Sequence, residues 1–179
     1  MLKHLTSVAS AAAPIAALAA ALAVASSLPA AAQTVQRVGD FTDWSAFQAE
    51  ENDQPVCFIV SRPKKDEGNY TRRGDIYAMV AQRPDERRLD EATFIAGYTF
   101  REGSSVTVTV GDRQFTLFTQ DDGAWALDDQ GNQALVQAMI NGIEMVVEGT
   151  SSRGTATRDT YSLRGFTAAH RASREACGL

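Results

Sequence analysis

The pattern between Val106 and Phe118 constrains the fold more than any other part of the chain. Valine and threonine alternate before Gly111-Asp112, and apolar and polar residues alternate after it. A two-residue Gly-Asp loop suits the turn types that match the twist of β-strands. The loop places Val110 opposite Arg113, Val108 opposite Phe115 and Val106 opposite Leu117. Apolar side chains then share one face, which predicts a half-buried antiparallel hairpin.

Further short apolar runs follow the same pattern from Val56 onward. Turn residues separate them, which is typical of an antiparallel sandwich or barrel. We expect a polar loop over residues 64–69 and a charged connection over residues 83–88. The other predicted strands cover residues 56–60, 76–81, 93–98, 143–147 and 157–163. The sequence therefore predicts a mainly β fold.

Two short helices accompany these strands. The first is expected over residues 133–141, where apolar side chains recur at helical spacing and Gly142 provides a stop. The second should start with Thr167 as its N-cap and run to about Cys177. Its stripe of small residues is expected to pack on the sheet: Ala169, Ala172 and Ala176.

Residues 1–32 have the features of a secretory signal peptide. Lys3 precedes an alanine-rich apolar stretch, and small residues precede Gln33. The alternative is an uncleaved membrane anchor, which needs about 20 strongly apolar residues. This stretch is mainly alanine and contains Pro14. We expect cleavage between Ala32 and Gln33 and a periplasmic, surface or secreted protein with no later membrane-spanning segment.

Cleavage would leave residues 33–179 as one domain. Of the 179 residues, 147 would remain, an ordinary length for a single domain. Loss of Lys3 would change the formal net charge from −5 to −6. A mildly acidic domain does not favour nucleic-acid binding, so no nucleic-acid partner is expected.

Cys57 and Cys177 both lie in the exported part. An even number of cysteines in an oxidising compartment predicts one disulfide. It would close a loop of roughly 120 residues and contribute about 4 to 5 kcal/mol in the chain-entropy model. The alternatives are a catalytic thiol or a metal-binding pair, but no histidine or CxxC spacing accompanies either cysteine.

Other catalytic and metal-site signals are weak. His170 would be the one histidine of the mature sequence, and we expect it on the surface of an arginine-rich helix. Asp128-Asp129 matches a fragment of a calcium loop, but a turn before a helix N-terminus explains it. The sequence also lacks a G-x-S-x-G motif. No catalytic residue, metal or cofactor is therefore expected.

Positive charge gathers in two loops of this acidic chain. It is suited to docking on lipid headgroups, polysaccharide or an acidic partner, and solvated loops are the alternative. The candidate binding patch comprises Arg62, Lys64, Lys65, Arg72 and Arg73, and the second group comprises Arg83, Arg87 and Arg88. Four aromatic residues are candidates for a sugar platform, with core or rim packing as the expected role: Trp44, Tyr98, Trp125 and Tyr161.

Several motifs of the exported part occur together. They are Asp43-Trp44, Pro55-Val56-Cys57, Ser61-Arg62-Pro63-Lys64, the run at 98–104, and a closing stretch from Gly149 to Cys177. With these motifs the chain resembles the invasion-associated locus B family of exported bacterial proteins. The resemblance covers nearly all of the mature chain and is most specific over residues 159–169. It implies an immunoglobulin-like β-sandwich without established enzymatic activity or cofactor, linked in some pathogens to host-cell entry.

The chain is similar to a two-cysteine branch of that family. These features favour an exported, non-catalytic protein that binds an envelope or host component. One alternative is a periplasmic hydrolase with paired carboxylates, for which the sequence offers acids but no spacing signature. The other is a structural or chaperone-like envelope factor.

Overall fold

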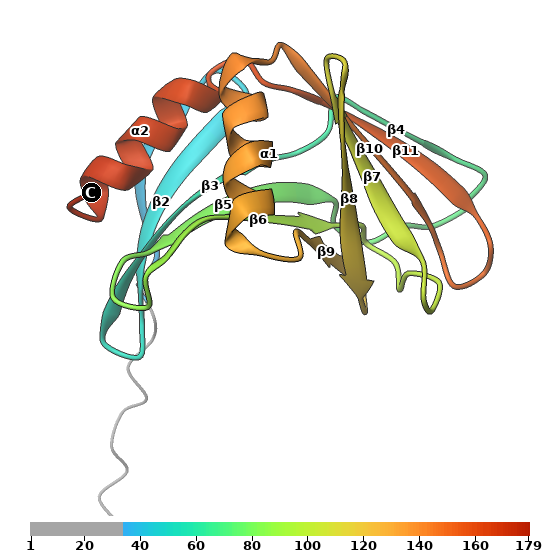
Figure 1. Ribbon diagram of the computed structural model, residues 1–179, viewed down its shortest axis with the longest axis horizontal. Coiled ribbons are helices and arrows are strands. Elements are labelled where there is room, and N and C mark those ends of the chain that lie inside the picture. Colours follow the sequence, from blue (N-terminus) through green and yellow to red (C-terminus); the bar gives the residue numbers. More distant parts are fainter. Residues whose placement is uncertain (1–33) are drawn as a thin grey trace, which may run out of the picture. The chain divides into compact units, whose positions relative to one another are not determined.

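The computed structural model describes residues 34–179, so the predicted signal peptide and its cleavage site lie outside the described residues. Eleven strands and two helices form the described part (Figure 1). The first strands are β1 (Gln36–Phe41), β2 (Trp44–Glu51), β3 (Gln54–Ser61), β4 (Lys65–Gly68), β5 (Tyr77–Arg83) and β6 (Arg88–Ile95). The others are β7 (Ser105–Val110), β8 (Arg113–Gln120), β9 (Gly123–Trp125), β10 (Glu144–Thr150) and β11 (Ala156–Ser162). The helices are α1 (Asp129–Asn141) and α2 (Phe166–Ala176).

The strands form one antiparallel ladder in the order β1-β2-β3-β5-β6-β9-β8-β7-β10-β11-β4. The short strand β9 joins a layer ending at β6 to a layer beginning with β8, and Figure 1 shows these two strands running in different directions on either side of it. The described part is therefore a mainly β, antiparallel sandwich with two short helices, as predicted. Its two layers share a continuous ladder.

The predicted hairpin is confirmed in every pairing. Val110 lies opposite Arg113, and the pairs at Val108 and Val106 follow in the expected register. All three valines are buried, while Thr116 on the opposite face is exposed. The later strand pair is confirmed as β10 and β11. Alternation of apolar and polar residues therefore determines which face of this layer is buried.

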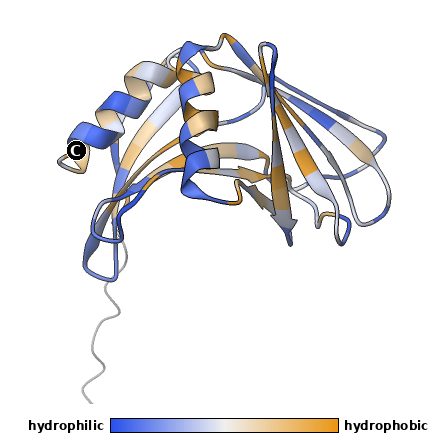
Figure 2. Ribbon diagram, viewed as in Figure 1, coloured by the Kyte–Doolittle hydropathy of each residue, from blue (hydrophilic) through white to orange (hydrophobic). Residues whose placement is uncertain are grey.

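The core lies between the two layers and under both helices. Ile59 and Phe94 come from the first layer, Val108 and Met145 from the second, and Leu135 from α1. Figure 2 shows hydrophobic residues alternating with hydrophilic ones along the strands. β9 pairs with only three residues of β6, and α1 packs beside the part of β6 that β9 leaves free. There the Asn132 side-chain oxygen accepts from the Ala92 N–H at 3.0 Å.

The first helix begins earlier than predicted. Residues 129–132 precede the apolar spacing but already belong to α1. Asp128 is the N-cap, and its carboxylate accepts from the Gly131 N–H at 2.7 Å. This confirms the turn and helix N-terminus expected at Asp128-Asp129, because a carboxylate satisfies a free N–H of the first turn.

The predicted N-cap of the second helix is wrong. α2 begins at Phe166, and Gly165 precedes it with a φ of 88°. A Cβ at Gly165 would lie 1.8 Å from the Phe41 carbonyl oxygen, so the close approach of β1 requires glycine here. The Thr167 hydroxyl instead donates to the Ile140 carbonyl at 3.1 Å and links the two helices.

Four strands were not expected from the sequence. β1 and β2 precede the first predicted run, and β9 has only three residues. The predicted polar loop over 64–69 contains β4, which pairs with Thr157–Thr160 of β11. β4 lies at the edge of the ladder, where charged side chains are common and apolar alternation is not required. The run predicted over 93–98 is also shifted, because β6 ends at Ile95.

A disulfide joins Cys57 of β3 to Cys177, which caps the C-terminus of α2, with 5.8 Å between the Cα atoms. This confirms the predicted pairing. The surface position predicted for His170 is wrong, because only 9% of the residue is exposed. His170 follows Phe166 by four residues on the same helix face, and the rings stack 5.9 Å apart. Ala169 on this face is fully buried, as expected.

Candidate functional site

The candidate site is a polar groove between three loops at one end of the second layer. The loops comprise residues 69–74, 97–99 and 151–157, and the hollow has a volume of about 720 Å³. Its lining consists of arginine, tyrosine, asparagine, serine, threonine and glycine. Neither an acidic residue nor an aliphatic side chain such as leucine lines it.

Two glycines bring the first two loops together. The Gly74 N–H donates to the Gly97 carbonyl at 2.9 Å. Gly97 has a φ of 70°, and a Cβ there would lie 2.7 Å from the backbone of Gly74. Because only glycine tolerates both the positive φ and the close approach, this contact fixes the spacing of the loops.

A buried ion pair supports the groove. The Arg73 guanidinium donates to both carboxylate oxygens of Asp159 at 2.6 Å, and the two side chains are 4% and 5% exposed. The Arg73 Nε also donates to the Ala96 carbonyl at 2.6 Å. Burial raises the pKa of the Asp159 carboxyl, and the Arg73 ion pair opposes that rise. Arg73 therefore connects its loop to β11 and to the end of β6.

Two tyrosine rings hold the same arginine. The Arg73 guanidinium carbon lies 5.0 Å from the centre of the Tyr98 ring and 5.5 Å from that of Tyr70, within cation–π range. The Tyr98 hydroxyl bonds to the Thr157 hydroxyl at 2.6 Å, and the Tyr70 hydroxyl donates to Asp66 at 2.5 Å. Burial raises the pKa of the Tyr98 hydroxyl. Both tyrosine hydroxyls are therefore hydrogen-bonded, and the two rings together with Arg73 form the base of the groove.

The free polar groups of the groove lie above this base. Arg72 and Arg153 form no ion pair or side-chain hydrogen bond with any described residue, and both are exposed. They come from two different loops that line the same groove. Four hydroxyl groups on the lining also have no hydrogen-bond partner among residues 34–179: Thr71, Thr99, Ser152 and Thr155.

The structure divides the basic patch predicted from the sequence. Arg72 and Arg73 belong to the polar groove, but the Arg73 charge is buried and paired instead of exposed. Arg62 pairs with Asp75 at 3.1 Å, and Lys65 pairs with Glu67 at 2.8 Å.

Lys64 contacts Asp43, and its hydrogen bond lowers the pKa of that carboxyl. Of the five predicted residues, Arg72 alone has no acidic partner among the described residues. Arg153 was missed because it is the one basic residue of the loop between β10 and β11 and so forms no cluster of charge in the sequence. Only the fold brings it into the same groove as Arg72.

Comparison with known proteins assigns the chain to a family. The invasion associated locus B protein family matches residues 44–174. The chain belongs to this family. The crystal structure of invasion associated protein b from Bartonella henselae is similar to it with a TM-score of 0.51 and 14% sequence identity, over 75% of this chain and 92% of that chain. No curated protein sequence matches the chain.

Family membership and the disulfide agree on the compartment. Stable disulfides form outside the reducing cytoplasm, which suggests an extracytoplasmic protein. No helix within residues 34–179 is long and apolar enough to span a membrane.

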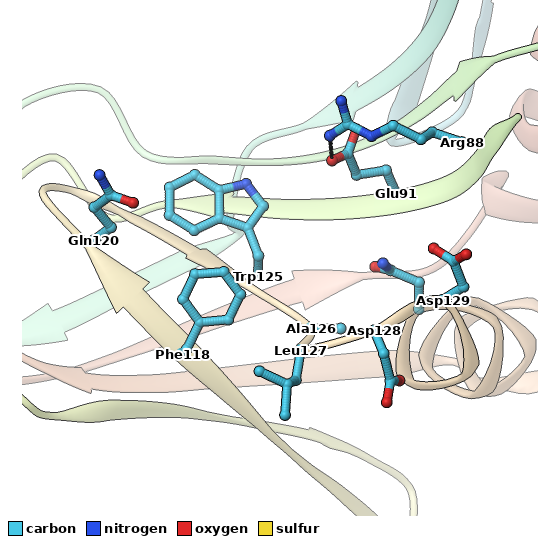
Figure 3. A pocket seen from close by; sticks show the side chains of 10 residues that line it. Arg88, Glu91, Phe118, Gln120, Trp125, Ala126, Leu127, Asp128 and Asp129 are labelled. Atoms are coloured by element: carbon cyan, nitrogen blue, oxygen red, sulfur yellow. Dashed lines mark hydrogen bonds and ion pairs between the residues drawn. The ribbon is translucent and has the colours of Figure 1, made fainter. Parts of the chain in front are cut away.

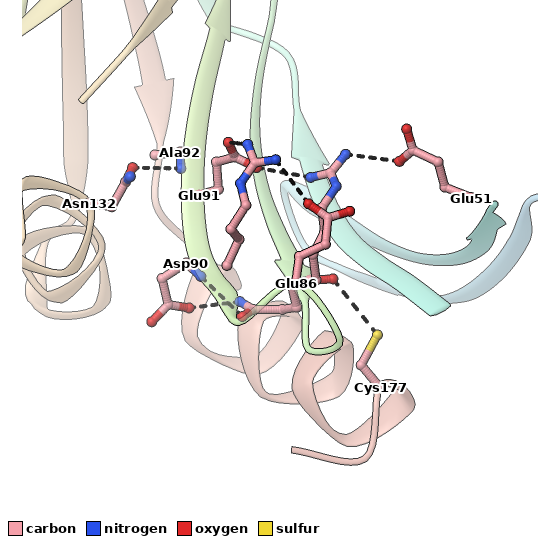
Figure 4. Close-up of polar contacts among 10 residues, drawn as sticks. Glu51, Glu86, Asp90, Glu91, Ala92, Asn132 and Cys177 are labelled. Carbon is pink, nitrogen blue, oxygen red and sulfur yellow. Dashed lines mark hydrogen bonds and ion pairs between the residues drawn. The ribbon is translucent and has the colours of Figure 1, made fainter. Parts of the chain in front are cut away.

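Two of the three residues in the second predicted basic group, Arg83 and Arg88, belong to a network with three glutamates, whereas the exposed Arg87 has no acidic partner among the described residues. Arg83 pairs with Glu51 at 3.1 Å and with Glu91 at 2.9 Å. Arg88 pairs with Glu86 at 3.1 Å and also contacts Glu91 (Figure 4). Because each of these arginines has two acidic partners, the network offers little positive charge to a ligand.

A smaller hollow of about 380 Å³ lies between β6, β9 and the start of α1. Figure 3 shows the Phe118 and Trp125 rings beside it, and their centres are 5.7 Å apart. Leu127 on its edge is 84% exposed. Glu91 contributes a carboxylate that already bonds to Arg83 and Arg88. Asp128 also lines the hollow and caps α1, and Asp129 lines it without a partner among the described residues. The hollow therefore combines apolar surface with acidic side chains.

The aromatic residues predicted as a platform do not gather in one place. Trp44 and Tyr161 are 1% exposed and belong to the core, as expected for structural aromatics. Tyr98 lies in the polar groove, and Trp125 lies at the smaller hollow.

The acidic groups of the described residues do not gather into a metal-binding cluster. Within the described residues, no three His, Cys, Asp or Glu side chains gather closely enough to hold a metal ion. The His170 Nε2 lies 2.7 Å from an Asp90 oxygen, but the Gln82 amide donates to the same oxygen at 2.7 Å. Burial alone would raise the pKa of Asp90, but the hydrogen bonds from His170 and Gln82 outweigh it and lower the pKa. This pair joins α2 to the β5–β6 hairpin.

Proposed function

We propose that this protein is exported to the bacterial periplasm or cell surface and acts without catalysis, by binding an anionic envelope component in the polar groove. The observation that carries the proposal is that two arginines without an acidic partner among the described residues, Arg72 and Arg153, lie on two loops of a groove whose lining includes no carboxylate. The chain as a whole has a formal net charge of −5. A local absence of acids in an acidic protein favours an anionic ligand at that place.

Two contacts favour binding over hydrolysis. A general acid or base must reach the reacting group within hydrogen-bond distance. Two acids lie next to residues of the groove: Asp159 of β11 and Asp66, its cross-strand partner on β4. Both Asp159 oxygens accept from the Arg73 guanidinium, and an Asp66 oxygen accepts from the Tyr70 hydroxyl. Asp90 is similarly held by His170 and Gln82. Because these acids already take part in structural contacts, binding is favoured over hydrolysis by paired carboxylates.

Capture in intact cells tests the proposal. Wild-type protein is compared with the double variant Arg72→Glu/Arg153→Glu and with Arg87→Glu/Arg113→Glu, which changes the charge equally at exposed sites outside the groove. After chemical cross-linking, bound proteins, lipids and glycans are identified by mass spectrometry. We expect one component to be captured by wild type and control and lost from the groove variant. Equal capture by all three would refute the site.

Two further results would contradict the function itself. Turnover of an envelope-derived substrate by the purified protein would establish an enzyme. Broad loss of other exported proteins in a deletion strain, restored equally by wild type and by the groove variant, would indicate a structural or chaperone-like factor.

A further inference from the structure

The polar groove combines three chemical features that a simple anion does not need. They are two unpaired guanidinium groups, a set of unpaired hydroxyl groups, and a lining without aliphatic side chains. We infer that the ligand is an anionic oligosaccharide, bound through its carboxylate or phosphate and through its ring hydroxyls. This inference rests on the proposed binding function and specifies its ligand.

The size of the groove excludes the smallest ligands as its full occupants. Its volume of about 720 Å³ falls within the roughly 300–1,000 Å³ of typical small-molecule sites. A single phosphate ion would fill a small part of it. A lipid tail fits the volume but not the lining, since acyl chains require extensive apolar contacts and, apart from the Tyr70 and Tyr98 rings, the lining consists of hydroxyl, amide and guanidinium side chains and glycine.

The hydroxyl groups match sugar chemistry. Thr71, Thr99, Ser152 and Thr155 have hydroxyls without protein partners among the described residues. A hydroxyl both donates and accepts hydrogen bonds, whereas a carboxylate or a phosphodiester only accepts. A ligand with several hydroxyls therefore uses both capacities of this wall. An anion without hydroxyls leaves the acceptor capacity to water.

The two arginines supply the charge recognition. A guanidinium binds a carboxylate or phosphate through two parallel N–H donors. Arg72 and Arg153 can form such bonds because neither has a partner among the described residues. The Arg73 side chain already donates to the Asp159 carboxylate and to the Ala96 carbonyl. The buried Arg73 pair thus holds the loop in place, and its exposed neighbour Arg72 contacts the ligand.

An array of acidic and neutral oligosaccharides tests the ligand class. We expect wild-type protein to bind uronate- or phosphate-bearing saccharides and not their neutral counterparts. Arg72→Gln/Arg153→Gln should lose this binding, and Arg87→Gln/Arg113→Gln should keep it. Binding of neutral and acidic saccharides alike would overturn the role of charge. No binding to any saccharide, with groove-dependent capture in cells retained, would overturn this inference and leave the proposed function standing.

Calorimetry then separates an oligosaccharide from a simple anion. Two ligands are titrated: the saccharide that binds most tightly in the array, and inorganic phosphate. Each is titrated into the groove variant Thr99→Val/Thr155→Val and into the control variant Thr107→Val/Thr116→Val, whose substitutions lie on the outward face of the hairpin. Loss of two hydrogen bonds should weaken saccharide binding about ten-fold in the groove variant and leave phosphate binding unchanged. If wild-type protein bound phosphate as tightly as the saccharide, the groove would be a site for simple anions, and the inference would be wrong.

Discussion

Two polar side-chain pairs connect distant segments of this protein, and they differ in burial and in what they support. Arg73 and Asp159 are separated by 86 residues, and Asp90 and His170 by 80. The first pair supports the polar groove and is 4% and 5% exposed at its side chains. The second joins the middle of α2 to the β5–β6 hairpin, and its His170 and Asp90 side chains are 11% and 19% exposed.

Their chemistry differs as well. The Arg73 guanidinium stays charged at every pH a protein encounters, so only the Asp159 carboxyl can change the charge of that pair, and burial raises the pKa of that carboxyl. The Asp90 carboxylate is shared by His170 and Gln82, whose hydrogen bonds outweigh burial and lower its pKa. The comparison teaches that the polar groove is supported by one deeply buried pair, whereas α2 is attached by several less buried polar contacts and one covalent bond.

Removing the disulfide at the end of α2 should lower the free energy of unfolding more than breaking either polar pair. Cys57→Ser and Cys177→Ser should each lower the free energy of unfolding by about 5 kcal/mol, since the bridge closes a sequence separation of 120 residues. The double variant should be no worse than either single variant. Denaturant unfolding under oxidising conditions measures this. Additive losses would mean that the two cysteines act independently.

Breaking the groove pair should be nearly as costly. Arg73→Met leaves Asp159 buried without its partner, so the free energy of unfolding should fall by about 3 to 5 kcal/mol. Arg73→Met/Asp159→Leu should recover much of that loss because no unpaired charge remains. Thermal unfolding of the single and double variants measures both. Equal stability of the two would show that the ion pair matters less than the tyrosine contacts around Arg73.

The second pair should lose stability in acid, a loss that the first pair lacks because the pKa of Asp159 is raised and not lowered. The lowered pKa of Asp90 means that its ionised form stabilises the fold above about pH 4, and this contribution is lost as the pH falls through the folded-state pKa. Asp90→Asn should cost about 1 to 3 kcal/mol at neutral pH. It should also flatten the fall in stability below pH 4. Asp75→Asn, at an exposed pair, is the control and should retain the wild-type profile.

The smallest effect on stability is expected at Arg72 and Arg153, the two residues whose substitution should change binding most. Arg72→Gln/Arg153→Gln should alter the free energy of unfolding by less than about 0.5 kcal/mol per residue, because both side chains are exposed and unpaired. Denaturant unfolding measures this beside the binding experiments. A large loss of stability would mean that these arginines are structural and would weaken their assignment to the ligand.

The sequence predicted those parts of the molecule in which local pattern and burial agree. The hairpin from Val106 to Phe118 has both a turn signal and alternation, and its register is confirmed. The exposed edge strand β4 has neither, so it was taken for a loop. Thr167 was a good N-cap by type, but the close packing of Gly165 on Phe41 determined where α2 begins.

The site shows the same division. The sequence by itself determined the fold class, the disulfide and the family, because alternation, cysteine count and motifs are properties of contiguous residues or of composition. It also gave Arg72 as a candidate for binding. Only the tertiary structure decided that Arg73 is buried with Asp159, that His170 is buried, and that Arg153 and Arg72 line the same groove. Each of these depends on contacts between segments distant along the chain, which local sequence patterns do not encode.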